Sequence, residues 1–218
     1  LCLRLGLDHL VDLPRAAFGP QPLPRTPRFV ECLFAVSVIV PVAISVSDGN
    51  PLRLTIAAVP LVAGILLLLE RPLRRPGSLG QAMASLPAIA LAGPVLAFSA
   101  PLSHWTSSTT LLLGIGVIIA VVSLATLGRS FGVLPAARRP VQKGPYRWIR
   151  HPAYLGQLLM LTACGLSVSP QMGGLIVIIA TACLCLRIRA EEQILGDEWP
   201  AYREYMGRVR WRLLPLLW

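Results

Sequence analysis

The sequence predicts an all-α fold, a polytopic bundle of about six membrane segments in which the last two form a short helical hairpin before a cytoplasmic C-terminal helical segment. Three observations lead to this prediction. Hydrophobic residues make up 55% of the 218 positions and charged residues only 14%, as is typical of membrane proteins. Six apolar stretches have about the length of a membrane helix. Basic residues gather in alternate loops.

The apolar stretches divide one integral membrane domain, residues 1–218, into three parts. These are an N-terminal interfacial segment (1–28), four membrane helices (29–127) and a motif region with the hairpin and tail (128–218). The six predicted segments are Phe29–Ser47, Leu52–Leu69, Leu79–Pro101, Ser107–Leu127, Ala153–Ser169 and Gly173–Leu186. The last two are short and meet at Ser169-Pro170-Gln171, which predicts a tight turn and leaves open whether the hairpin crosses the whole bilayer.

The distribution of the twenty basic residues predicts the orientation in the membrane. Nineteen of them fall in the N-terminal segment, the second and fourth loops and the tail, and only Arg53 falls on the other side. Positive loops stay in the cytoplasm, so a multi-pass protein of the cell membrane with both termini cytoplasmic is expected. The net charge of +10 is therefore assigned to topology and bilayer contact, because no patch typical of nucleic-acid binding is present.

The absence of acidic and basic residues near the centre of any predicted span argues against ion or proton transport. Polar residues suited to chemistry are instead concentrated in Ser130–Tyr154 and Arg187–Arg212, which flank the hairpin. A hairpin returns the chain to the side that it left, so these two segments are expected to lie close together with a pocket between them.

The first of these segments contains Arg150-His151-Pro152 just before the predicted hairpin. Proline favours an extended residue before it and takes the first position of a helix readily. The next amides, those of Ala153, Tyr154 and Leu155, should then point out of a helix N-terminus, which suits a carboxylate or a phosphate. The same pattern also occurs as a topology signal with a helix cap, so both interpretations stay open.

The second segment carries Arg187 and Glu191 with i,i+4 spacing, and Glu192 lies about 100° further round the helix. A surface ion pair of small energetic value is one interpretation of this spacing, and a functional site is the other. Gly196 and Pro200 are expected to break the segment into two helices.

Taken together, the motifs of the last ninety residues or so resemble the isoprenylcysteine carboxyl methyltransferase and phospholipid methyltransferase superfamily. The matching residues are Gly144-Pro145-Tyr146, Arg150-His151-Pro152, Tyr154, Gly156, Arg187, Glu191-Glu192, Leu195, Tyr202, Tyr205, Val209 and Pro215. The sequence departs from many members at Trp199-Pro200, where those members have Phe-Gly, and this leaves the substrate open.

The resemblance implies a membrane methyltransferase with S-adenosylmethionine as methyl donor, S-adenosylhomocysteine as product and no metal. It implies cofactor contacts from Tyr146, Arg150, His151, Pro152, Ala153, Tyr154, Leu155, Gly156, Glu191 and Glu192. Arg187 would orient an acidic acceptor, and Glu192 would act as base for an amine or thiol. The acceptor is expected to be lipophilic or membrane-delivered, and a prenylated cysteine carboxylate, a phospholipid amine, a small thiol and an isoprenoid acid all remain open.

Two other functions compete with this one. A membrane sterol-type reductase would share the Arg-His-Pro-x-Tyr pattern and use a nicotinamide cofactor, although the chain is short for that class. A non-catalytic membrane scaffold would use the basic loops to hold anionic lipid headgroups and would bind no nucleoside.

Overall fold

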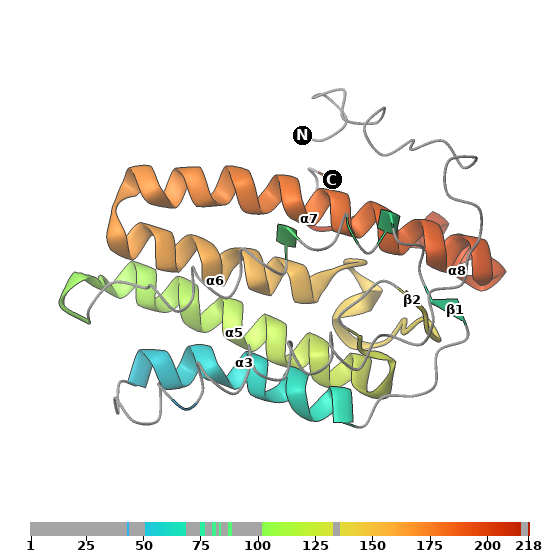
Figure 1. The fold of residues 1–218 in the computed structure, drawn as a ribbon, viewed down its shortest axis with the longest axis horizontal. Helices are drawn as coiled ribbons and strands as arrows, with labels where there is room; N and C mark the ends of the chain where they lie inside the picture. The colour runs from blue at the N-terminus through green and yellow to red at the C-terminus, as the bar shows by residue number, and fades with distance from the viewer. Residues whose placement is uncertain are drawn as a thin grey trace.

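A computed structural model describes residues 43, 51–68, 75–76, 80–81, 83, 87–88, 102–132, 136–214 and 218 of the chain. Long helices lie side by side along the long axis of the molecule, and a short helix follows the last of them (Figure 1). The helices are α3 (Pro51–Leu68), α5 (Ser107–Leu127), α6 (Pro152–Val168), α7 (Pro170–Glu198) and α8 (Pro200–Arg208).

Short elements connect these helices. They are the 3-10 helices η1 (Leu102–His104), η2 (Gly128–Ser130) and η3 (Gly144–Arg147), and the two-residue strands β1 (Arg75–Pro76) and β2 (Ala136–Ala137). The strands pair antiparallel, with Arg75 opposite Ala137 and Pro76 opposite Ala136. Apart from this pairing, the regular structure of the described residues is helical, which confirms the predicted all-α class for that part of the chain.

Four of the six predicted membrane segments correspond to described helices. Helix α5 has the predicted bounds, α3 and α6 differ from the predicted stretches by one residue at each end, and α7 contains the sixth stretch. Most of Phe29–Ser47 and most of Leu79–Pro101 lie outside the described residues, so six segments remain a prediction.

Two of the described helices are long and apolar enough to cross a membrane, within Ser107–Ser130 and Pro170–Glu198. Only 33% of the most apolar window of each is buried inside the protein. Large apolar side chains instead point outward, among them Leu111, Ile118 and Ile178, which are 65%, 64% and 70% exposed. Such exposure is expensive in water and favourable in lipid, so these two helices fit a membrane environment.

The turn between α6 and α7 contains a single non-helical residue. Ser169 is extended, its amide donates to the carbonyl of Gly165 at 3.1 Å, and its Oγ accepts from the amide of Met172 at 3.1 Å. Pro170 takes the first position of α7, where no amide is needed. A Cβ on Gly165 would lie 2.9 Å from the Cα of Gly173, so the hairpin closes only with small residues here. The predicted tight hairpin is thus confirmed.

The second helix of this hairpin continues well beyond its apolar part. Helix α7 has 29 residues, about 43 Å at 1.5 Å per residue, and ends at Glu198. The predicted break at Gly196 is wrong, because this glycine is buried inside α7 and tertiary packing outweighs its low helix propensity. Pro200 begins α8, as predicted, since proline cannot continue the helix before it.

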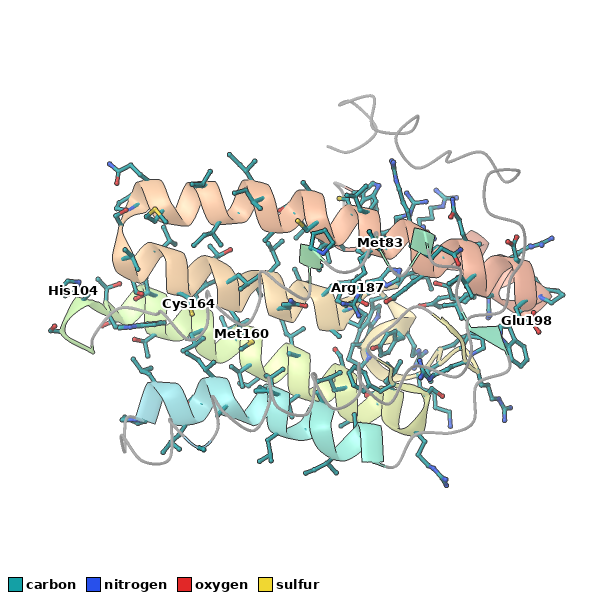
Figure 2. All side chains as sticks on the ribbon, viewed as in Figure 1. Met83, His104, Met160, Cys164, Arg187 and Glu198 are labelled. Carbon is teal, nitrogen blue, oxygen red and sulfur yellow. The ribbon has the colours of Figure 1, made fainter. Side chains whose placement is uncertain are left out.

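The packing of the helices brings both polar segments to one end of the molecule. Helix α6 runs away from η3 toward the Ser169 turn, and α7 returns toward α8 (Figure 1). His104 lies at one end of the molecule and Glu198 at the other, and Arg187 lies between them, nearer the middle (Figure 2). The N-terminus of α6 and the charged half of α7 are therefore neighbours.

Candidate active site

The segments Ser130–Tyr154 and Arg187–Arg212 come together at this end, as the hairpin argument predicts. Nε2 of His151 lies 3.1 Å from Oε1 of Glu192, although 41 positions separate the two residues in the sequence. The hydroxyl of Tyr154 donates to Oε1 of Glu191, which lies 37 positions later. The predicted pocket between the segments stays a prediction.

Glu192 is the centre of the polar cluster. Its Oε1 binds Nε2 of His151 and lies 2.9 Å from Nη1 of Arg150. Its Oε2 accepts a hydrogen bond of 2.9 Å from Nε of Arg212. Both carboxylate oxygens are thus occupied, and the side chain is 6% exposed. A buried carboxylate is stable only when it is paired in this way.

The neighbouring Glu191 belongs to a second, more accessible group. Nε of Arg187 donates to the hydroxyl oxygen of Tyr154 at 2.7 Å and to Oε1 of Glu191 at 3.3 Å. Oε2 of Glu191 has a looser neighbour, Nδ1 of His151 at 3.9 Å. Glu191 is 19% exposed, about three times as much as Glu192. The i,i+4 pair is therefore part of a network that joins α6 to α7, not an isolated surface pair.

Aromatic and cationic groups line the contact between α6 and α7. The rings of His151 and Tyr154 are stacked, with centroids 5.6 Å apart and planes 6° apart. The guanidinium of Arg187 lies 5.1 Å from the centre of the Tyr154 ring, within the range of a cation–π interaction. Tyr154 is thus fixed both through its hydroxyl and through its ring.

The N-terminus of α6 departs from the prediction in part. Pro152 takes the first helical position, as expected. The amides of Tyr154 and Leu155 donate to the carbonyl of His151 at 3.1 and 3.2 Å, so they do not point outward as predicted. The helix tightens at its first turn and satisfies these two donors itself. Of the three amides predicted to point outward, only that of Ala153 is not recorded as a donor to the His151 carbonyl.

Two other predicted contact residues are not in the polar cluster. Gly156 is buried against α5, where an added Cβ would lie 2.6 Å from the amide nitrogen of Ala120 and from the carbonyl oxygen of Gly116. Leu155 packs beside an apolar cluster that includes Leu158. The side of α6 that carries Gly156 thus serves helix packing, whereas the side that carries Tyr154 faces α7.

Tyr146 occupies a supporting position in η3. Its side chain is buried, and its carbonyl accepts a hydrogen bond of 2.7 Å from the hydroxyl of Tyr205. Gly144 begins η3 with a φ of +54°, which explains the glycine in this motif because other residues are strained there. Burial raises the pKa of the Tyr146 hydroxyl well above its usual value, so this hydroxyl keeps its proton.

The residues of α8 and its surroundings form a separate apolar cluster. Tyr202, Tyr205 and Val209 are buried in it, and Leu195, Trp199 and Met206 pack against it. The alternating spacing of these residues places them on one side of the chain, and this side is buried in the cluster. Through the Tyr205 hydroxyl this cluster holds η3, and hence the turn that leads to His151.

Sequence reasoning missed Arg212 as a member of the site. Its side chain reaches Glu192 from a non-helical segment 20 residues further along. Residue spacing predicts contacts within a helix, but it does not predict a contact between a helix and an irregular segment. The one signal for Arg212 is that a buried Glu192 carboxylate needs cationic partners.

Fold and site together define a helical protein with exposed apolar helices and a polar cluster at one end of a helical hairpin. In a comparison with known families, residues 109–197 match the isoprenylcysteine carboxyl methyltransferase family. The match covers α6, nearly all of α5 and all but the last residue of α7, and it contains both sequence motifs. The resemblance of the motifs to this family is thus confirmed over that range.

A curated relative is also similar over about half of its length. The cobalt-zinc-cadmium resistance protein CzcN of Cupriavidus metallidurans is 32% identical over 114 residues, which are 49% of this chain and 52% of that protein. The chain therefore spans about half the length of this curated relative. Its name refers to metal resistance and mentions no methyl acceptor.

Proposed function

We propose that this protein is a membrane methyltransferase that moves a methyl group from S-adenosylmethionine to a lipophilic or membrane-delivered acceptor. The observation that carries the proposal is the buried network of His151, Tyr154, Arg187, Glu191 and Glu192 at the end of an apolar hairpin. The matching family is one of methyltransferases, and the exposed apolar helices suit a site that a membrane substrate can reach.

The chemistry of the donor set fits S-adenosylmethionine. This cofactor carries a carboxylate, an ammonium group, ribose hydroxyls and a purine. Nε of Arg150 is buried and has no hydrogen-bond partner among the described residues, and the Ala153 amide lies at the adjoining helix N-terminus. These two donors suit the carboxylate. Oε2 of Glu191 suits the ammonium group or a ribose hydroxyl, and the stacked rings of His151 and Tyr154 suit the purine.

The charges of the cluster also favour an anionic group in the ligand. Arg150, Arg187 and Arg212 contribute three positive charges against two negative charges from Glu191 and Glu192. S-adenosylmethionine adds one net positive charge, because its ammonium and sulfonium groups outnumber its carboxylate, so a carboxylate in the acceptor would offset part of the excess. This favours an acidic acceptor such as a prenylated cysteine carboxylate over an amine.

The residues divide the work according to their contacts. When bound, the cofactor supplies an electrophilic methyl group on a sulfonium, so the protein has mainly to align the partners and exclude water. Arg187, held by Tyr154 and Glu191, is placed to orient the acceptor. Glu192 has both oxygens occupied by donors, so it serves better to position His151 and Arg150 than to remove a proton.

Calorimetry on the detergent-purified protein tests the proposal. S-adenosylmethionine or S-adenosylhomocysteine should bind with micromolar-range affinity, and the proposal fails if neither binds. Binding of a nicotinamide dinucleotide in their place would favour the reductase, and an absence of nucleoside binding would favour the scaffold.

Three variants test the roles assigned to individual residues. His151→Ala should weaken cofactor binding about ten- to a hundredfold, because it removes an aromatic ring that is placed to stack on the purine. Arg187→Ala should chiefly lower turnover with a prenylated cysteine acceptor. Arg208→Ala is the matched control, because this exposed arginine of α8 pairs with Gln142 outside the cluster. Equal losses for Arg187→Ala and Arg208→Ala would contradict the assigned site.

A further inference from the structure

The chain after α8 is bonded to the turn that precedes α6. We call Val209–Leu214 together with Trp218 the C-terminal segment. The amides of Arg150 and His151 donate to the carbonyls of Trp211 and Arg212 at 2.9 Å each. The turn that presents His151 is therefore tied at its backbone to a segment far along the chain, and this segment lies beyond the family match.

Arg212 is the residue of this segment that reaches into the cluster. Its Nε donates to Oε2 of Glu192 at 2.9 Å, and its guanidinium lies 5.0 Å from the ring of Trp218. Its own amide donates to the carbonyl of Trp218 at 2.9 Å. Backbone and side chain thus both hold the guanidinium in place, although the side chain is 28% exposed.

We propose that Arg212 is a positioning residue of the candidate active site and acts through Glu192 on His151. Among the described residues, Arg212 donates to Oε2 of Glu192, whereas His151 and Arg150 both contact Oε1. Without Arg212, Oε2 is buried without a partner, and the carboxylate is free to rotate toward Arg150. His151 then loses the acceptor that orients its ring.

The contact with Glu192 decides which ring nitrogen of His151 carries hydrogen. A carboxylate can only accept, so Nε2 must donate in the 3.1 Å bond to Glu192. Nδ1 is then the nitrogen on the side of Glu191. By fixing Glu192, Arg212 fixes this arrangement and the stacking of His151 on Tyr154, both of which face the proposed ligand site.

Nitrogen-15 NMR of histidine-labelled protein tests the proposal without any cofactor. The chain has three histidines, and His151→Gln identifies the signals of His151. The native protein should show hydrogen on Nε2 of His151. Arg212→Ala should give a mixture of forms, Arg212→Lys should keep the native pattern, and Arg208→Ala should change nothing. Unchanged His151 signals in Arg212→Ala would overturn the proposal. Arg212→Gln, which removes the charge but keeps a shorter polar side chain, replaces the alanine variant if that variant does not fold.

A double-mutant cycle then tests the route through Glu192, and this part rests on the proposed function. Arg212→Ala and Glu192→Gln should each weaken S-adenosylmethionine binding about tenfold, and the double variant should lose little more than either. Additive losses, about a hundredfold together, would show that Arg212 acts independently of Glu192. If the native protein binds no cofactor, the proposed function fails while the NMR result still decides the role of Arg212.

Discussion

Glu191 and Glu192 are neighbours in the sequence, but α7 places their side chains in different surroundings. Glu192 is 6% exposed and holds His151, Arg150 and Arg212, whereas Glu191 is 19% exposed and has one loosely paired oxygen. Consecutive helical residues point about 100° apart, which is enough to separate a structural carboxylate from one that can meet a ligand.

We predict that glutamine at these two positions has different effects. Glu192→Gln leaves Arg150 and Arg212 without a counter-charge in a buried site, so it should cost about 3 kcal/mol of stability as well as cofactor affinity. Glu191→Gln should keep the melting temperature and weaken cofactor binding about tenfold. Thermal unfolding and calorimetry on both variants check this. Equal losses of stability would contradict the division between the two carboxylates.

The buried tyrosine hydroxyls predict a loss of stability at alkaline pH. Burial raises the pKa of Tyr205 from 10.0 to about 12, so the folded protein keeps a proton that the unfolded chain releases. This contribution to stability is complete below about pH 10 and is lost as the pH rises toward about 12. Tyr205→Phe should therefore show a shallower fall in melting temperature across this range. An identical slope in both proteins would contradict this assignment.

At the scale of the elements, the close contact between α5 and α6 depends on Gly116, Ala120 and Gly156. A Cβ on Gly156 would meet backbone atoms of α5 at 2.6 Å, and backbone cannot rotate away as a flexible side chain can. This contact sets how near the start of α6 lies to α5. It therefore helps to position the turn that carries His151.

We predict that Gly156→Ala destabilises the protein by about 1 to 3 kcal/mol, the usual cost of overpacking. Gly174→Ala is the matched control, since nothing lies within 4 Å of an added Cβ at that helical position. The control should be neutral or stabilising, because alanine favours a helix by about 1 kcal/mol over glycine. The melting temperatures of the two variants test this prediction. Equal melting temperatures would mean that α6 can move away from α5 without a loss of stability.

At the scale of the whole molecule, the polar cluster lies away from the hairpin turn. The turn is at the same end as His104, whereas Arg187 lies between His104 and Glu198 (Figures 1 and 2). The segments Ser130–Tyr154 and Arg187–Arg212 hold eleven of the twenty basic residues, which the positive-inside rule places in the cytoplasm. The proposed active site would then face the cytoplasm, where S-adenosylmethionine is made.

Reporter fusions in a bacterial host test this orientation. Alkaline phosphatase fused after Ser103 should be active, because this loop is predicted to face outward. Fusions after Gln142 and after Leu195 should be inactive, because both positions are predicted to be cytoplasmic. The reverse pattern, or activity after Leu195, would show that the predicted topology is wrong.

Much of the site followed from local patterns. The spacing of Arg187 and Glu191, the proline at the start of α6 and the turn at Ser169 each depend on a few neighbouring residues, and the structure has them as predicted. The outward-pointing amides of Tyr154 and Leu155 were predicted wrongly, because the first turn of α6 bonds to the carbonyl of His151. Gly156 packs against α5, and its predicted contact with the cofactor stays a prediction.

The sequence by itself determined the helical class, the apolar hairpin and the two polar segments at its ends, because hydrophobic length and the capping preferences of proline and serine are local properties. Only the tertiary structure decided which charges meet. Arg212 is paired with Glu192 by the path of an irregular segment, and the two glutamates differ because α6 and the C-terminal segment bury one more than the other. Electrostatic partners of this kind depend on distances in space, which residue spacing in the chain does not encode.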